Sequence, residues 1–152
     1  MPSNPYRTSP TNGAVGEIQT KPERIADMPY APAMRVTAGT DLLFISGATA
    51  SALYHKHPHD FSEHDHPTDI REQVHRAMAN VKEVLDHEGL TWTDIIKVTK
   101  YMTDMRDFET MTITLKDYFG DWTPASTAIC VNQLSTPGAR IELEMVAAYP
   151  AR

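Results

Sequence analysis

Residues 140–149 read RIELEMVAAY, and polar and apolar side chains alternate regularly over its first six residues. Successive side chains of a β-strand point to opposite faces of a sheet, so the apolar odd-numbered residues of 141–147 share one face and Glu142 and Glu144 point to the other. The apolar face needs a cover. The stretch therefore predicts a strand of a sheet that carries helices on the face away from the two glutamates.

Two segments upstream have the spacing of the helices that would form this cover. Asp69, with an acidic residue three positions later, is typical of a helix start, and apolar residues then recur on one face until Gly89. A second helix is expected to begin after Asp104 or Asp107 and to end at Gly120.

Four further short runs are rich in apolar or β-branched residues and are predicted to be strands. The first two are separated by a turn that contains Gly39, which predicts a hairpin. The resulting order, β-β-α-β-α-β-β, is that of an α+β protein with two helices on one face of a mixed sheet. The four runs are residues 34–37, 42–46, 94–104 and 126–131.

The remaining organisation follows from composition and length. Residues 1–27 are rich in Pro, Ser, Thr and Asn without an apolar period, which predicts an N-terminal tail or wrapping arm, and residues 28–152 are predicted to form a single domain. No apolar run approaches the roughly 20 residues that span a membrane, and the N-terminus does not resemble a signal peptide. We expect a cytoplasmic protein with no membrane partner.

The charge of the chain argues against nucleic acid as a partner. The formal net charge is −6, and no run or stripe of Lys and Arg is present. Proteins that bind nucleic acid neutralise phosphates with such basic surfaces.

The face of the sheet that carries Glu142 and Glu144 must also be covered. A chain of 152 residues with two helices on one face has too little left to cover the other. We therefore expect a second copy of the chain to do so, which predicts a homo-oligomer.

Four stretches together resemble the RidA/YjgF family of enamine and imine deaminases, over roughly residues 33–149. They are FISGATA (44–50), the segment from IREQ to FETM (70–111), WTPASTAICVNQL (122–134) and GARIELEMVAAYP (138–150). The resemblance implies a chorismate-mutase-like fold and a homotrimer with active sites in clefts between subunits. It also implies hydrolysis of a small-molecule enamine or imine to an oxo acid and ammonia, without a cofactor.

Within this family, the DIREQ segment, the C-terminal stretch and the long insert before the first helix look closest to the 2-aminomuconate deaminase branch. Proteins of that branch act in the catabolism of aromatic rings, on a linear conjugated enamine diacid. A substrate of this kind needs a longer cleft wall, which residues 50–68 would supply.

The resemblance assigns roles to three residues. Glu144 matches the glutamate that positions or activates the hydrolytic water, and the alternative for it is an intersubunit ion pair. Glu142 shares its parity but reads as a surface or rim residue. Ser46 and Gly47 match a Ser-Gly pair whose backbone lines the cleft, although the same residues suit an ordinary strand end at which glycine allows a bend.

One position departs from the family pattern. Deaminating members carry an arginine that anchors the substrate carboxylate, and the sequence Pro-Ala-Ser-Thr at 124–127 places Ser126 there instead. Ser126 would either hydrogen-bond a ligand or pair with backbone. Thr127, which follows Ser126, and Trp122, which lies beside the Pro-Ala-Ser turn, complete the predicted substrate-binding set. Arg35 and Arg140 are the nearest substitutes for the missing guanidinium, though each also suits a surface or subunit-contact charge.

Five histidines lie in the polar segment 54–67. They alternate without the spacing of helical or knuckle-type ligands, so we interpret the segment as a solvated loop near the cleft and assign no metal site. One imidazole could still serve as a proton donor or ligand contact. The five are His55, His57, His59, His64 and His66.

These observations favour a cytoplasmic, cofactor-free, trimeric deaminase in which Glu144 handles the water. The alternative is a non-catalytic small-molecule-binding trimer, whose chemistry lapsed when the arginine was lost. The ribonuclease activity sometimes attached to this family is disfavoured by the acidic charge.

Overall fold

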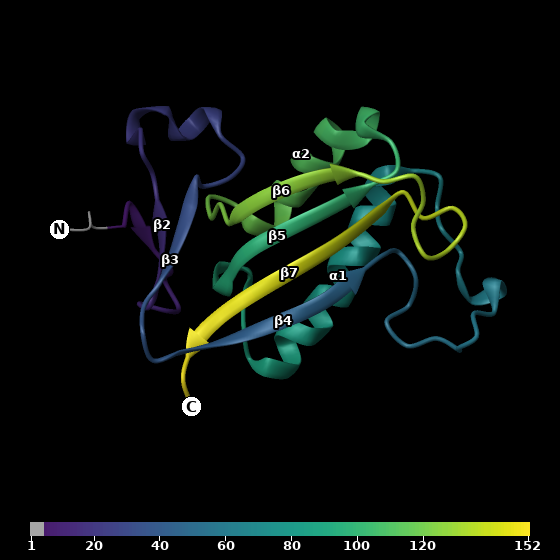
Figure 1. Ribbon diagram of the computed structural model, residues 1–152, viewed down its shortest axis with the longest axis horizontal. Helices are drawn as coiled ribbons and strands as arrows, with labels where there is room; N and C mark the ends of the chain where they lie inside the picture. The colour runs from purple at the N-terminus through teal and green to yellow at the C-terminus, as the bar shows by residue number, and fades with distance from the viewer. Residues whose placement is uncertain (1–4) are drawn as a thin grey trace.

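The computed structural model describes residues 5–152. Its main feature is a four-stranded sheet with the strand order β4-β7-β5-β6, and both helices lie behind this sheet (Figure 1). The strands β4 and β5 are antiparallel to β7, and β6 is parallel to β5, so the sheet is mixed. This is the predicted α+β arrangement. The elements are β4 (Thr40–Ala48), α1 (Ile70–Glu88), β5 (Ile95–Met102), α2 (Phe108–Phe119), β6 (Ala125–Cys130) and β7 (Ile141–Pro150).

The β7 strand shows the alternation on which the prediction was based. Ile141, Leu143 and Met145 are fully buried in the core against the helices, whereas Glu142 is half-buried and Glu144 is exposed. The helix α1 contributes an apolar stripe to the same core, which includes Val74, Met78 and Val81. The sheet therefore has one face covered by helices and one open face, to which the two glutamates belong.

Both predicted ends of α1 are confirmed. The side chain of Asp69 accepts a hydrogen bond from the backbone N–H of Arg71 at 2.9 Å, and Gly89 follows the helix in the left-handed conformation with φ of 69°. A residue with a Cβ is disfavoured there, which explains why the helix stops at a glycine. At α2, Asp107 is the residue before the helix, and the side chain of Asp104 caps the short helix η4 that precedes it.

The predicted hairpin between residues 34–37 and 42–46 is wrong. The strand β3 (Ala33–Val36) pairs with β2 (Val15–Ile18), which also pairs with β1 (Arg7–Thr8), in a separate three-stranded sheet. The turn at Gly39 exists, with φ of 79°, but the strand after it pairs with β7. A turn motif locates a change of direction and does not determine which strand becomes the partner.

The N-terminal segment, predicted to be a tail or arm, contains β1 and β2 within its described part. Its packing depends on a buried polar residue: the carboxylate of Glu17 accepts hydrogen bonds from the backbone N–H of Thr123 at 2.7 Å and from the Thr123 hydroxyl at 3.0 Å. The sequence pattern did not predict this packing, because a buried glutamate adds nothing to an apolar periodicity. The division of the chain at residue 28 stays a prediction.

Four short 3-10 helices complete the described chain. They are η1 (Pro22–Asp27), η2 (Phe61–Glu63), η3 (Trp92–Asp94) and η4 (Met105–Asp107). Among residues 5–152, no helix is both long and apolar enough to cross a membrane.

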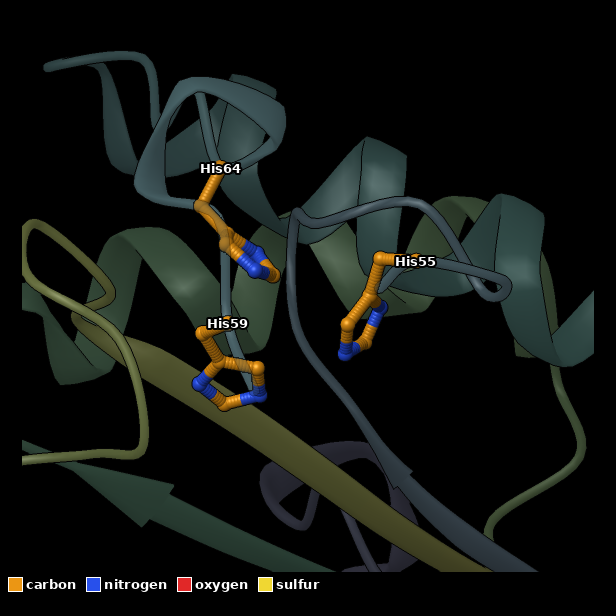
Figure 2. Close-up of side chains that lie close together, drawn as sticks. All are labelled: His55, His59 and His64. Carbon is orange, nitrogen blue, oxygen red and sulfur yellow. The ribbon is translucent and has the colours of Figure 1, made fainter. Parts of the chain in front are cut away.

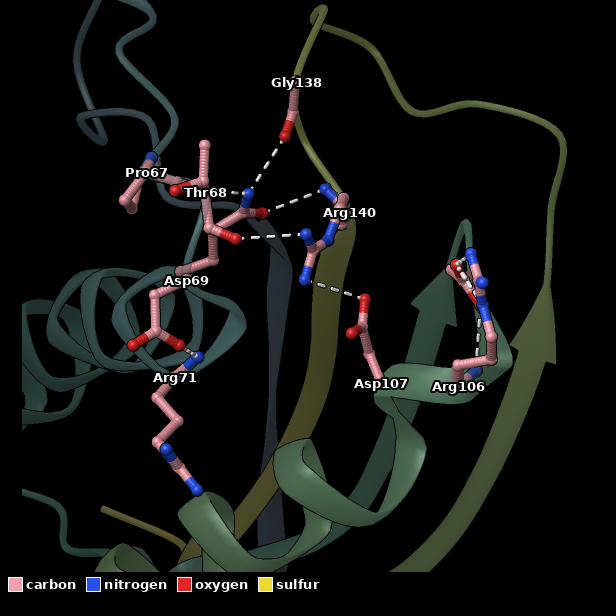
Figure 3. A network of polar contacts seen from close by, with 10 residues as sticks. Pro67, Thr68, Asp69, Arg71, Arg106, Asp107, Gly138 and Arg140 are labelled. Carbon is pink, nitrogen blue, oxygen red and sulfur yellow. Dashed lines mark hydrogen bonds and ion pairs between the residues drawn. The ribbon is translucent and has the colours of Figure 1, made fainter.

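A polar network ties the start of α1 to the loop that leads into β7 (Figure 3). The buried amide of Gln73 donates to the carbonyls of Pro67 at 2.8 Å and Gly138 at 2.9 Å, and its oxygen accepts from the backbone N–H of Arg140 at 2.9 Å. The Arg140 guanidinium donates to the Thr68 carbonyl at 3.0 Å. This network positions the first residues of β7.

We predict that Gln73→Met destabilises the protein by about 2–4 kcal/mol, because three backbone groups lose their partners while the volume is kept. Urea denaturation measures the effect. Gln133→Met is the matched control, at an exposed position of the loop that leads into β7. It is expected to change the free energy of unfolding by less than about 0.5 kcal/mol. Equal effects of the two substitutions would show that the network does not contribute to stability.

Candidate functional site

The open face of the sheet carries a row of polar side chains at its centre. The strand register places Glu144 beside Thr99, and Thr99 beside Thr127. Two residue pairs further along, Glu142 lies opposite Tyr101. Two carboxylates, a phenol and two hydroxyls from three adjacent strands thus share one face.

Tyr101 and Glu144 are joined directly. The Tyr101 hydroxyl donates a hydrogen bond to Oε2 of Glu144 at 2.9 Å. This bond, with some burial and the charges of Glu144 and Glu142, raises the pKa of Tyr101, so the phenol stays protonated and keeps donating. One carboxylate oxygen of Glu144 is held in a fixed direction, and the other is not used in this bond.

Glu142 is the more buried of the two carboxylates. Burial, followed by the nearby charge of Glu144, raises the pKa of Glu142 above its ordinary value. A carboxyl group with a raised pKa holds its proton at higher pH and is better suited to proton transfer near neutrality. Interpreting Glu142 as a rim residue therefore missed the stronger electrostatic signal on this face.

Gly47 explains how Glu142 comes to be enclosed. A Cβ at position 47 would overlap the carboxylate of Glu142, so the β4 backbone and this side chain are in contact. The register between β4 and β7 shifts between Ile45 and Ala48, which brings the backbone of Ser46 and Gly47 out of the regular ladder. A larger residue at position 47 would force the Glu142 side chain to move away from the β4 backbone.

Thr127 lies on the same face as Glu144 and contacts a cation. The ammonium of Lys97 donates to the Thr127 hydroxyl at 2.7 Å. Lys97 precedes Thr99 by two residues, so both side chains point to the open face. The open face therefore also holds Lys97 beside Thr127, a charge that the sequence analysis had not assigned to the site.

Ser126 and Trp122 lie elsewhere in the chain. Ser126 pairs with Val98 and, with Trp122, lines a pocket of about 590 Å³ between β5, β6, α2 and η1, on the helix side of the sheet. The Trp122 indole is buried and donates to the carbonyl of Ile95 at 2.8 Å. Within the chain, the structure thus brings Ser46, Gly47 and Thr127 to the face of Glu144, and separates Ser126 and Trp122 from it.

Lys100 is the notable titratable group of that pocket. It is buried, its ammonium lies 6.0 Å from the centre of the Phe108 ring, and burial together with the charge of Lys97 lowers its pKa to about 8. The pocket is thus lined by a lysine whose charge is easily lost.

Neither arginine considered as a substitute clamp lies on the open face next to Glu144. Arg140 forms an ion pair with Asp107 at 3.0 Å in the network of Figure 3, so its guanidinium is committed to the protein. Arg35 belongs to β3, in the separate small sheet.

The histidine-rich segment forms a loop between β4 and α1, as predicted, but its side chains are not dispersed in solvent. The rings of His55, His59 and His64 approach one another (Figure 2). Burial and the neighbouring imidazoles of His57, His64 and His55 lower the pKa of His59. Sequence spacing had not revealed this cluster, because the loop folds back on itself.

Comparison of the amino-acid sequence with known proteins identifies relatives of this chain. The family model described as Endoribonuclease L-PSP matches residues 21–149. A RutC family protein of Pyrococcus abyssi is 38% identical over 79 residues, which cover 52% of this chain and 61% of the relative. A 2-iminobutanoate/2-iminopropanoate deaminase of Bos taurus is 33% identical over 81 residues, covering 53% and 58% respectively. The chain spans about three fifths of the length of these curated relatives.

The fold has a counterpart among solved structures. The crystal structure of YyfB from Yersinia pestis, a protein of unknown function of the conserved Rid protein family, superposes with a TM-score of 0.71. The match covers 88% of this chain and 98% of that chain at 22% identity, so it speaks for the fold alone.

We predict that Glu144→Gln lowers the pKa of Glu142 towards the ordinary value of about 4.3, without reaching it. Removal of the neighbouring negative charge takes away one cause of the shift, and burial remains. Carbon-detected NMR titration of the Glu142 carboxyl group measures this. Glu83→Gln, an exposed change on α1, is the control and should leave the titration unaltered. An unchanged pKa in Glu144→Gln would show that the two carboxylates are not coupled.

Proposed function

The chain belongs to the Endoribonuclease L-PSP family, and from this membership we propose that it is a hydrolytic deaminase of reactive enamines or imines. The name of the bovine relative, an iminobutanoate and iminopropanoate deaminase, supports this class of reaction. The finer proposal is a conjugated substrate similar to 2-aminomuconate. The activity would make the protein a scavenger or a catabolic enzyme for small unstable molecules.

The observation that carries the proposal is the carboxylate pair on the open face. Glu142 is half-buried with a raised pKa, and Glu144 beside it is held by Tyr101. Two carboxyl groups whose environments differ can divide the roles of acid and base. We assign the acid to Glu142 and the base to Glu144.

The reaction needs both roles. Glu144 takes a proton from water while the water oxygen attacks the carbon of the C=N bond, and Glu142 supplies a proton to the nitrogen, which gives a carbinolamine. Glu144 then passes the proton that it took from water to the carbinolamine nitrogen, and the Glu142 carboxylate takes the hydroxyl proton as the C–N bond breaks and the nitrogen leaves as ammonia. The products are the oxo compound and ammonia. An enamine would first be protonated at carbon to give the imine.

Substrate binding is assigned to the groups around this pair. Ser46 and Gly47 present backbone at the side of Glu142, and Thr127 with Lys97 presents a hydroxyl and a cation near Glu144. Lys97 would attract a substrate carboxylate in place of the arginine that Ser126 replaces. An ammonium cannot make the two parallel hydrogen bonds of a guanidinium, so a substrate held by Lys97 needs further contacts to fix its orientation.

We further propose that the site is completed by a homotrimer. The open face exposes large apolar side chains beside its polar row: Phe44 is 73% exposed, Leu42 48% and Ile129 40%. Phe44 and Leu42 lie on the edge strand β4 and Ile129 on the opposite edge strand β6, so exposed apolar side chains flank the polar row on both sides, as is common at a subunit contact. Such a contact would exclude water and raise the pKa of Glu142 further.

The alternative is a trimer of the same fold that binds a small molecule without reacting with it. It is favoured by the serine at position 126, because Ser126 cannot hold a carboxylate as the family arginine does. The two hypotheses differ in whether the carboxylates affect turnover.

We predict that Glu142→Gln and Glu144→Gln each lower the rate of imine hydrolysis by about 10²–10⁴-fold, because an amide neither accepts nor donates the transferred proton. Ammonia release from a panel of imino acids and conjugated enamines measures the rate. Glu83→Gln is the matched control. A folded wild-type protein that binds panel members without turnover would support the non-catalytic alternative. Full activity in Glu142→Gln would show that Glu142 takes no part in the reaction.

We predict that wild-type protein sediments as a trimer and that Phe44→Glu dissociates it and abolishes hydrolysis, because a charge would be buried in the contact. Ile113→Glu, which adds the same charge at a 66% exposed position of α2, should remain trimeric. Sedimentation velocity distinguishes the species. A trimeric Phe44→Glu protein would place the contact on another surface.

A further inference from the structure

Three histidines of the loop between β4 and α1 converge on one point (Figure 2). One ring nitrogen from each of His55, His59 and His64 lies within 4.8 Å of the other two. The rings come from different turns of the loop, and no hydrogen bond joins them to one another among the described residues. Three imidazole rings that converge without hydrogen bonds to one another leave room for one bound ion or group that contacts all three.

His64 is the anchor of the cluster. Its side chain is 6% exposed, and its Nδ1 lies 2.8 Å from the hydroxyl of Ser51, which is itself buried. The other nitrogen, Nε2, is buried and has no hydrogen-bond partner within the described part of the chain. A buried polar atom without a partner destabilises a protein unless something binds it.

The orientation of His64 is supported by a chain of hydrogen bonds. The Ser51 hydroxyl also lies 3.3 Å from Nε2 of His66, and the same nitrogen lies 2.7 Å from the hydroxyl of Thr136. Ser51 and Thr136 are buried, so the chain is shielded from water. Outer partners of this kind fix the ring orientation of metal-binding histidines.

In His55, as in His64, Nδ1 is the hydrogen-bonded ring nitrogen. Its Nδ1 lies 2.9 Å from the backbone carbonyl of Ala52. A carbonyl only accepts, so Nδ1 carries the proton and the lone pair of the ring resides on Nε2. A histidine whose one nitrogen donates to a carbonyl and whose other nitrogen is available is the arrangement seen in metal ligands.

We propose that His55, His59 and His64 bind one divalent transition-metal ion per chain, of which zinc is the expected species. Neutral imidazole is a ligand for Zn²⁺, and three protein ligands leave a fourth tetrahedral position for water or a ligand group. Zn–N bonds of about 2.0–2.1 Å place ligand nitrogens about 3.3 Å apart, so the imidazoles must approach by roughly 1.5 Å at most. His55 and His59 lie on exposed loop segments that permit this movement around the fixed His64.

The experiment uses untagged full-length protein, stripped with a chelator and titrated with Zn²⁺ against a chromophoric competitor. We expect one ion per chain with submicromolar affinity. His64→Ala and His59→Ala should each weaken binding by at least about 100-fold, and Ser51→Ala by roughly 10–100-fold, since it removes only an outer partner. His87→Ala, at an exposed position on α1, is the matched control and should bind as wild type does.

A second measurement guards against loss of binding through misfolding. Co²⁺ is added in place of Zn²⁺, and the visible absorption of the bound ion reports its coordination, while far-ultraviolet circular dichroism confirms the fold of each variant. We expect the intense bands of a four-coordinate nitrogen-rich site in wild type and their loss in the exposed-loop variant His59→Ala. Binding that is weak, substoichiometric or equal in wild type and His59→Ala would overturn the proposal.

Discussion

The β7 strand buries every second side chain beneath α1 and α2, and this constraint determines what the opposite face can be. Because the helices cover one side of the sheet, the intervening residues are left for water, a ligand or another subunit. The polar row of Glu142, Glu144 and Tyr101 and the apolar surface of Phe44 both belong to that remaining face. The chemistry that we propose is therefore located where the chain's own fold provides no cover.

The elements that the sequence predicted correctly are those that local patterns specify. The alternation in β7, the capped stripe of α1 and the end of α2 at Gly120 each depend on neighbours a few residues away. The hairpin around Gly39 failed because strand partners are chosen by burial over long sequence distances. The β4 strand pairs with the distant and largely apolar β7, and β3 is left to pair with β2.

The candidate site was predicted in part for the same reason. Strand parity placed Glu142 and Glu144 on one face, but it could not rank them, because their difference arises from the contact between Gly47 and Glu142 at a bulge. Ser126 lies on the other face of the sheet. Successive side chains of a strand point to opposite faces, so Thr127 points to the open face and Ser126 points into the helix-side pocket. The histidine cluster depends on how a loop without periodicity folds, which residue spacing does not encode.

The histidine loop and the carboxylate pair are connected through the same end of the sheet. The loop leaves β4 after Ala48, the residue that follows Gly47, and the hydrogen bond between His66 and Thr136 fastens it to the segment that enters β7 just before Glu142. On the other side, Gln73 and Arg140 fasten that segment to the start of α1. Glu142 is thus approached by two loops that are each held by buried hydrogen bonds. A ligand that ordered the histidines would stiffen one of these supports, and with it the wall next to the half-buried carboxylate, without touching the reacting atoms.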